Sequence, residues 1–141
     1  MNHRGTETHR GSQREPISDA VNEVSGVIID AALQVHKSLG PGLLESVYEK
    51  CLCYELESRG LDVKRQVEVP LVYRDLQFDC GFRMDLLVND EVVVEIKAVE
   101  SVLPIHTAQL LTYLKVTENR AGLLINFNVA KLKNGIHRFV F

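Results

Sequence analysis

Three charged residues, Asp85, Glu95 and Lys97, stand in the two apolar runs that make up most of the stretch from Arg83 to Lys97. Buried carboxylates are costly unless they are paired or bound to a cation, so these groups need a chemical reason. Two carboxylates at about 4 Å would repel each other by roughly 4 kcal/mol at an effective dielectric constant near 20. A divalent cation would remove that cost, whereas Lys97 would offset only part of it. The set therefore favours a site for a hard divalent cation.

The geometry of this set depends on one turn. Apolar runs flank Asn89-Asp90, which predicts a β-hairpin whose arms are apolar enough to be central strands. Glu95 and Lys97 are two residues apart, so they leave the same face of their strand. A two-residue turn would place Asp85 opposite Val94, with Glu95 on the other face. A three-residue turn or a bulge would place Asp85 opposite Glu95, and the cation site requires this arrangement.

A fourth acid, Glu45, is expected in the first turn of a helix from about Leu43 to Arg59, which ends at Gly60. Tyr48 would be its neighbour on the helix surface. Glu45 either joins the cation site or only complements the helix dipole, as first-turn acids commonly do. The predicted apolar face consists of Leu44, Val47, Tyr48, Cys51, Leu52 and Leu56. The remaining acids, Glu49, Glu55 and Glu57, are expected on the solvated surface.

A preceding helix is predicted over residues 17–37 by apolar residues at helical spacing, with Ser18 as the N-cap. It must end before Gly40-Pro41-Gly42, because two glycines and a proline cannot continue it. His36 would lie in the last turn, where an imidazole can bond a carbonyl group or complement the dipole. We rank a metal or phosphate role for His36 below this capping role.

The rest of the chain predicts strands and one more helix. Extended segments are expected near residues 63–73, 77–88 and 91–97, with a turn at Arg74-Asp75. A buried strand over residues 121–127 would follow the helix, and Asn134-Gly135 would turn into a last strand over residues 137–141.

The helix in this region is predicted from Pro104 to about Thr117. Gln109 and Tyr113 are four residues apart and share one face, which taken alone predicts an exposed polar stripe. The residues expected on the buried side are Ile105, Ala108, Leu111 and Leu114.

Composition predicts a single globular unit. The 141 residues are enough for one hydrophobic core, which we expect over residues 16–141, after a disordered tail at 1–15. No apolar run has the length of a membrane span, and the N-terminus does not resemble a secretory signal. Cys51, Cys53 and Cys80 lack metal-type spacing and are expected to be reduced thiols. We therefore expect a cytoplasmic protein without a membrane partner.

Net charge leaves the kind of partner open. The chain carries −3 overall, and three Arg and one Glu in residues 1–14 leave −5 on the rest, from 13 basic and 18 acidic residues. Part of this deficit is the candidate site itself, with Glu45, Asp85 and Glu95. The balance neither supports nor excludes a nucleic-acid substrate.

A helix acid, a hairpin acid and an acid-x-lysine pair are what metal-dependent phosphodiester hydrolysis requires. From about residue 20 to its end, the sequence resembles the GxxExxY protein family, in the RecB-like clade of the PD-(D/E)XK nuclease superfamily. The namesake motif is Gly42-Leu43-Leu44-Glu45-Ser46-Val47-Tyr48. The split nuclease motif is Asp85 with Glu95-Ile96-Lys97. The clade's motif is Gln109-Leu110-Leu111-Thr112-Tyr113, and residues 122–128 also resemble the family.

The resemblance implies a mixed α/β (α+β) fold with a restriction-endonuclease-like α-β-β-β-α-β core, here from Leu43 to Phe127, after an extra N-terminal helix. It also implies roles for individual residues. The ligands of Mg²⁺ or Mn²⁺ would be Glu45, Asp85, Glu95 and the Ile96 carbonyl group. The catalytic set would be Glu45, Asp85, Glu95, Lys97, Gln109 and Tyr113, with His36 and Tyr48 as accessory residues.

Two classes of function stay open. The first is a Mg²⁺- or Mn²⁺-dependent nuclease acting on DNA, with RNA as a further substrate. The second is a non-catalytic or partner-dependent module that binds nucleic acid or protein, because a small core offers little of the roughly 1,000–2,500 Å² of a specific protein–DNA interface. A homodimer fits the first class, since one small site must act twice to cut a duplex. A merely structural Glu95–Lys97 ion pair would leave Asp85 and Glu45 unexplained.

Overall fold

A computed structural model describes residues 16–78 and 82–141 of the chain. The predicted tail over residues 1–15 and Cys80 lie outside the described residues. The helices are α1 (Asp19–Leu39), α2 (Glu45–Ser58), α3 (Pro104–Thr117) and the short 3-10 helix η1 (Leu132–Gly135). The strands are β1 (Val63–Glu68), β2 (Leu71–Tyr73), β3 (Leu76–Phe78), β4 (Arg83–Val88), β5 (Val92–Lys97), β6 (Ala121–Asn126) and β7 (Ile136–Val140).

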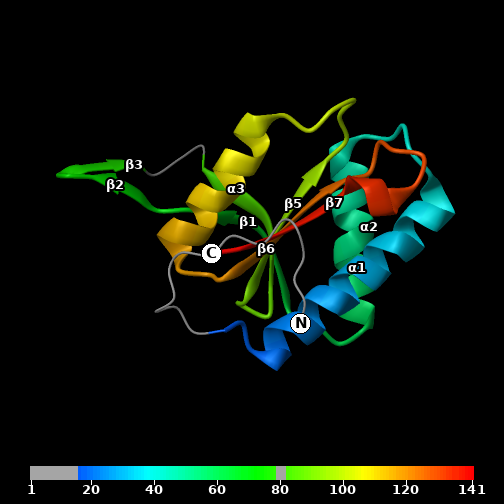
Figure 1. Cartoon of the computed structure of the whole chain (residues 1–141), viewed down its shortest axis with the longest axis horizontal. Helices are drawn as coiled ribbons and strands as arrows, with labels where there is room; N and C mark the ends of the chain where they lie inside the picture. Colours follow the sequence, from blue (N-terminus) through cyan, green and yellow to red (C-terminus); the bar gives the residue numbers. More distant parts are fainter. Residues whose placement is uncertain (1–15, 79–81) are drawn as a thin grey trace.

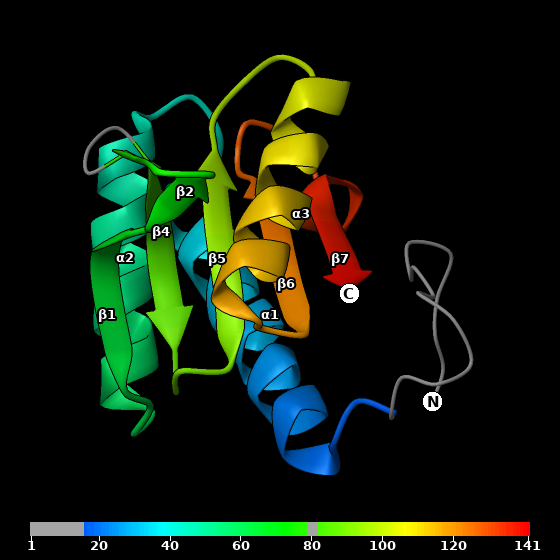
Figure 2. The same cartoon turned by 90° about the vertical axis from the view of Figure 1, so that its left-hand side faces the viewer.

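The main sheet lies between two layers of helices (Figures 1 and 2). Its five strands have the order β1-β4-β5-β6-β7, so β4 and β5 are central strands, as predicted. All neighbours are antiparallel except β5 and β6, which are parallel and are therefore joined by a long crossover through α3. Helices α1 and α2 cover one face and α3 covers the other. The order α2-β1-β4-β5-α3-β6, preceded by α1, confirms the restriction-endonuclease-like fold.

Helix α1 begins and ends as its sequence predicts. The Ser18 side chain accepts a hydrogen bond from the Val21 N–H group at 3.2 Å, which caps the first turn. Gly40 follows the helix with φ of 70°, and its N–H group donates to the His36 carbonyl at 2.8 Å. No helix in the described part of the chain has the length and apolar character required to cross a membrane.

Helix α2 packs on a narrower apolar face than predicted. Tyr48, Leu52 and Leu56 are fully buried, but Leu44 is 73% exposed. The difference arises because α2 contacts α1, β1, β4 and β5, and this packing leaves its first turn at the rim. The prediction that Glu49 is solvated is wrong, since this residue is buried. Its partners are described with the site below.

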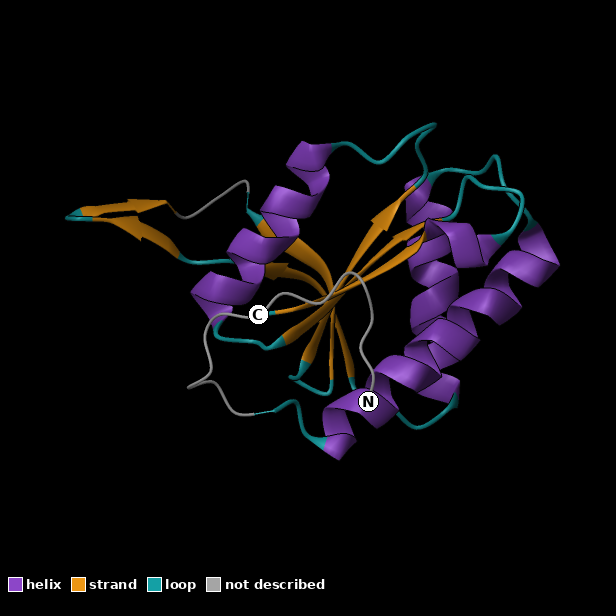
Figure 3. Cartoon of the chain, viewed as in Figure 1, coloured by secondary structure: helices purple, strands orange, loops and turns teal. Residues whose placement is uncertain are grey.

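The two long strands predicted over residues 63–73 and 77–88 are each interrupted. Pro70 lacks the N–H group that a continuous strand would use, and the chain leaves the main sheet between β1 and β2. Strands β2 and β3 form a separate two-stranded sheet around the predicted Arg74-Asp75 turn. This hairpin extends away from the body of the molecule (Figures 1 and 3), and its Val72 and Leu76 side chains are about three-fifths exposed.

The buried face of α3 differs from the predicted one. Leu110, Tyr113 and Leu114 face the sheet, whereas Ile105 is 67% exposed and Ala108 is exposed. Apolar residues lie all around this helix, so sequence spacing alone allowed more than one inward face. Gly122 of β6 selects the observed one, because a Cβ atom there would lie 3.1–3.2 Å from Leu110 and Leu114 carbons.

Candidate active site

The β4–β5 hairpin has the longer turn that a carboxylate site requires. Backbone pairing joins Leu86 to Val94, Leu87 to Val93 and Val88 to Val92, which leaves residues 89–91 as a three-residue turn. Asn89 and Asp90 both have positive φ, near 53° (52° and 54°), as a tight reversal demands. Continuing this register places Asp85 opposite Glu95. The predicted register is confirmed.

The two carboxylates lie where β4 and β5 separate. Regular pairing of these strands stops at Leu86 and Val94, and side chains take over beyond that point. The Asp85 N–H group donates to Glu95 Oε2 at 3.0 Å, and the Ile96 N–H group donates to Asp85 Oδ2 at 2.8 Å. Among the described residues, Glu95 Oε1 has no hydrogen-bond partner, and Asp85 Oδ1 has only a long 3.4 Å contact with Gln66 Nε2. One oxygen of each carboxylate thus remains available.

The neighbouring β1–β4 pair is distorted at the same level. Arg65 pairs with Leu86 and Val67 pairs with Met84, but the intervening positions Gln66 and Asp85 do not pair. Gln66 has φ of 52°. Leu86 packs in the core under α1 and α2, whereas Met84, two residues away on the same strand, packs in the core under α3. Residues two apart normally share a face, so the chain switches faces at Asp85.

Burial raises the pKa of both carboxyl groups above its ordinary value. Glu95 is only 4% exposed, and its burial, together with the adjacent Asp85 charge, raises its pKa to about 8. Burial also raises the pKa of Asp85, and the Glu49 charge adds to this effect. The positive charge of Lys97 acts in the opposite direction on both residues. A group of this kind favours a cation or a proton between its oxygens.

Glu45 reaches the same end of the sheet from α2. Its Oε2 atom lies 3.4 Å from the Ala98 N–H group, just beyond the last residue of β5. Tyr48 fixes the approach, since its hydroxyl donates to the Gly40 carbonyl at 2.6 Å and accepts from the Leu43 N–H group at 3.1 Å. Its ring stacks on Phe127 at 4.5 Å between centroids. The loop over residues 40–44 is therefore held by Tyr48, and it positions Glu45 at the start of α2.

Lys97 is the last residue of β5, the strand that also contains Glu95, and it is partly buried. Its carbonyl group accepts from the Phe127 N–H group at 2.9 Å. The buried Asn126 side chain holds the next loop, accepting from the Val99 N–H group at 3.0 Å and donating to the Val99 carbonyl at 2.9 Å. These bonds hold the segment that follows Lys97 against the end of β6.

The remaining predicted site residues differ in how close they lie to Asp85 and Glu95. Tyr113 is buried in the core cluster that also contains Met84 of β4 and Val93 of β5, and its burial, followed by the Glu95 charge, raises the pKa of its phenol. Gln109 is exposed and makes no hydrogen bond within the described part of the chain. His36 is buried, and its Nε2 atom lies 2.8 Å from the Val129 carbonyl oxygen. It therefore bonds a carbonyl group of a distant segment instead of one at the end of its own helix, which the predicted capping role required.

Two polar residues of the site were not predicted. Glu49 lies one helical turn after Glu45 and accepts from Arg65 Nε at 3.1 Å and from Gln66 Nε2 at 2.9 Å. The same Gln66 amide group is the one 3.4 Å from Asp85 Oδ1. The spacing of four residues between Glu45 and Glu49 was the available signal. Gln66 had none, because its importance depends on its backbone conformation.

The donor chemistry of this site fits a hard divalent cation. Carboxylate oxygens of Asp85, Glu95 and Glu45 and the Ile96 carbonyl group are the ligands that Mg²⁺ and Mn²⁺ prefer. As the side chains stand, residues 16–78 and 82–141 contain no group of three or more His, Cys, Asp or Glu grouped closely enough to hold a metal ion.

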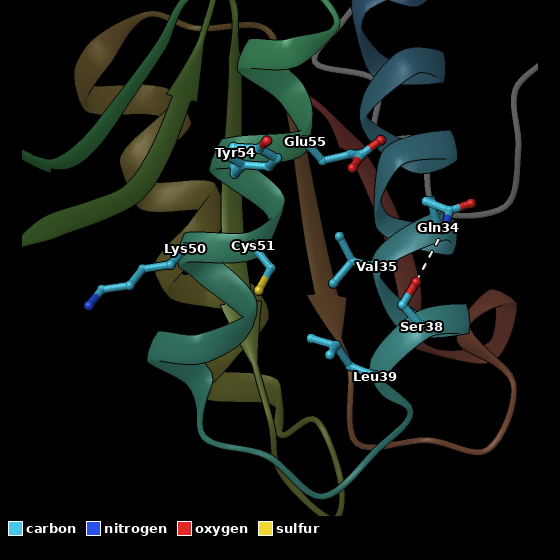
Figure 4. Close-up of a pocket in the computed structure, with 8 residues that line it drawn as sticks. All are labelled: Gln34, Val35, Ser38, Leu39, Lys50, Cys51, Tyr54 and Glu55. Carbon is cyan, nitrogen blue, oxygen red and sulfur yellow. Dashed lines mark hydrogen bonds between the residues drawn. The ribbon is translucent and has the colours of Figure 1, made fainter.

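A separate pocket lies between α1 and α2 (Figure 4). Its volume is about 290 Å³, and it is lined by none of the candidate site residues. It is lined by Gln34, Val35, Ser38, Leu39, Lys50, Cys51, Tyr54 and Glu55. The pocket is thus distinct from the carboxylate pair.

The fold and the carboxylate pair define a class of protein. A family model described as the PD-(D/E)XK nuclease superfamily matches residues 22–139 of the chain. The protein belongs to this superfamily, which indicates a nuclease and a nucleic-acid partner. No curated protein and no solved structure gives a significant match.

Proposed function

We propose that the protein is a Mg²⁺- or Mn²⁺-dependent nuclease that hydrolyses phosphodiester bonds in DNA, with RNA as a second substrate class. One observation supports this most directly. Asp85 and Glu95 lie across the point where two central strands separate, each with a carboxylate oxygen left available, and Lys97 follows on the same strand face. A purely structural site would pair these oxygens within the protein.

The chain's own residues would bind the cation and position the reacting groups. Asp85 Oδ1, Glu95 Oε1, the Ile96 carbonyl group and Glu45 would hold the ion, which when bound supplies Lewis-acid catalysis and a more acidic water. The Lys97 ammonium group would orient the attacking water and stabilise charge on the phosphoryl oxygens. Desolvation of the two acids strengthens their preference for a cation, because their charges are poorly solvated without one.

The outer residues would complete the site. Tyr113 and Gln109 on α3 would position the pair and a substrate phosphate, with Gln109 available at the surface. Tyr48 and His36 would act indirectly, through the loop before α2 and the contact with Val129. We also propose membership of the GxxExxY family and the RecB-like clade, a single domain over residues 16–141 and a homodimer on duplex substrates.

Cleavage assays with matched variants test this function. Single-stranded DNA, duplex DNA and RNA are incubated with the wild type and with Mg²⁺, Mn²⁺ or a chelator. Cleavage should require the cation and be abolished by Glu95→Gln and Asp85→Asn. The control is Glu91→Gln, which removes a charge from the turn of the same hairpin and should leave cleavage unchanged. Cation-dependent cleavage that survives both site substitutions would reject this site.

A second candidate is a partner-dependent module that binds nucleic acid or protein on the same fold. It is favoured by the spacing of the acids, which among the described residues do not form a closed set of three ligands. In that case the wild type alone would bind nucleic acid without cutting it at any cation concentration. Cleavage by the purified chain at low enzyme concentration would exclude this alternative.

A further inference from the structure

Gln66 combines an unusual backbone conformation with a central position. It is an interior residue of β1 whose φ of 52° lies in the left-handed region, which few non-glycine residues adopt. It is located directly opposite Asp85, at the one level where the β1–β4 ladder is interrupted. Strain of this kind persists only where the surrounding structure holds it in place.

Contacts of the Gln66 side chain hold this backbone conformation in place. Its Nε2 atom lies 2.9 Å from Glu49 Oε1 and 3.4 Å from Asp85 Oδ1. One amide group therefore faces two carboxylates that come from different elements, α2 and β4. Glu49 is buried and is anchored from the other side by Arg65 Nε at 3.1 Å. The chain of contacts runs Arg65, Glu49, Gln66, Asp85.

This chain of contacts ends at Asp85 Oδ1, the oxygen of the candidate site that faces Gln66. Asp85 Oδ2 is held by the Ile96 N–H group, so rotation of the carboxylate is restricted on that side. Its Oδ1 atom, which faces Gln66, is the oxygen available for a ligand. The amide donor limits where Oδ1 points. An additional carboxylate in place of the amide would instead repel it.

We propose that Gln66 is a positioning residue for Asp85. Its left-handed backbone opens the sheet at Asp85, and its amide group aligns the carboxylate through Glu49. The part of this inference that concerns a bound cation rests on the proposed function. The part that concerns the Asp85 orientation does not, and it can be measured in the metal-free protein.

The first test is amide hydrogen exchange in the metal-free protein. Gln66→Gly keeps the positive φ without strain but removes the side chain. Exchange of the Ile96 amide, which bonds Asp85 Oδ2, should accelerate about tenfold or more relative to the β6 amides. Gln66→Asn also tolerates the left-handed conformation but is one methylene shorter, and it should accelerate exchange as well. The control Arg74→Gly replaces another non-glycine residue with positive φ, in the β2–β3 turn. It should leave the exchange of the Ile96 amide unchanged.

The second test is calorimetric titration with Mn²⁺. Gln66→Gly should lower the Mn²⁺ affinity about 10–100-fold, the range typical of residues that orient a metal ligand, whereas Arg74→Gly should leave it unchanged. A purely structural residue would lower the melting temperature without changing the Mn²⁺ affinity. Unchanged Ile96 exchange in both Gln66 variants would overturn the proposal. Faster exchange in a protein that binds no Mn²⁺ would retain the positioning role and reject the metal-dependent function.

Discussion

Asp85 and Glu95 are joined through the backbone as well as by proximity. The Asp85 N–H group donates to Glu95 Oε2 at 3.0 Å, while the residue after Glu95 donates its N–H group to Asp85 Oδ2 at 2.8 Å. Each carboxylate thus replaces a missing hydrogen bond between separating strands. The two acids close the gap in the sheet and form the candidate site at the same time.

Substitution of Glu95 should change how stability depends on pH. The pKa of Glu95 is about 8 in the folded chain and near its ordinary value of 4.5 in the unfolded chain. The folded state therefore binds this proton more tightly, so the free energy of unfolding should fall as pH rises between these values. The contribution approaches about 1.4 kcal/mol per pH unit. Glu95→Gln should remove it.

Urea denaturation of the metal-free protein at about pH 5 and about pH 8 measures this difference. The wild type and Glu91→Gln should both lose stability toward the higher pH, whereas Glu95→Gln should lose much less. Equal losses in all three proteins would mean that Glu95 is ionised in the folded state throughout the range.

Substitution of Lys97 should separate binding from catalysis. Lys97→Met keeps the aliphatic stem that packs at the end of β5 but removes the charge. If the ammonium group acts on the developing phosphoryl charge, kcat should fall about 10²–10³-fold, with Mn²⁺ affinity retained in calorimetry. Equal loss of Mn²⁺ binding would show that Lys97 supports the ligands instead. Lys37→Met, on the exposed end of α1, serves as the charge control.

Removal of the Tyr48 hydroxyl should loosen the loop before Glu45. Tyr48→Phe preserves the stacking on Phe127 but leaves the Gly40 carbonyl and the Leu43 N–H group without this partner. We expect a loss of about 1–3 kcal/mol in thermal or urea unfolding. The control Tyr54→Phe removes the hydroxyl group of a residue that is 74% exposed, and it should have little effect on stability. Equal stability of the two variants would argue against the role of this hydroxyl.

Two glycine substitutions should act in opposite directions. A Cβ atom at Gly135 would lie 2.2 Å from the Asn126 carbonyl oxygen, so Gly135→Ala must displace the end of β6. We expect destabilisation of about 1–3 kcal/mol or more. Gly26 is helical and has nothing within 4 Å of an added Cβ, so Gly26→Ala should stabilise by roughly 0.5–1 kcal/mol. Melting temperatures of the two variants test both signs.

The register of the β4–β5 hairpin could be related to the sequence because the relevant rules are local. The parity of β-strands tied the meeting of Asp85 and Glu95 to the length of one turn, and the observed register satisfied it. Ser18, Gly40 and Gly60 similarly marked the helix ends, because capping depends on few neighbours.

The failures concern contacts between distant segments. Glu49 was expected in solvent, since nothing near it in sequence reveals Arg65 and Gln66 as partners. The inward face of α3 depended on the space left by Gly122 in another strand. Gln66 was unremarkable by residue type, and its backbone conformation is a property of the assembled sheet.

The three-residue turn at 89–91 also has a consequence for how this gene tolerates change. Single substitutions there leave the alternation of the strand unchanged, but deletion of one codon would shift every later β5 residue to the opposite face. Glu95 would then point away from Asp85 although no functional residue had been altered. The separation of ten residues from Asp85 to Glu95 is therefore as much a part of the motif as the acids themselves, and sequence searches that permit gaps there would accept chains unable to assemble the pair.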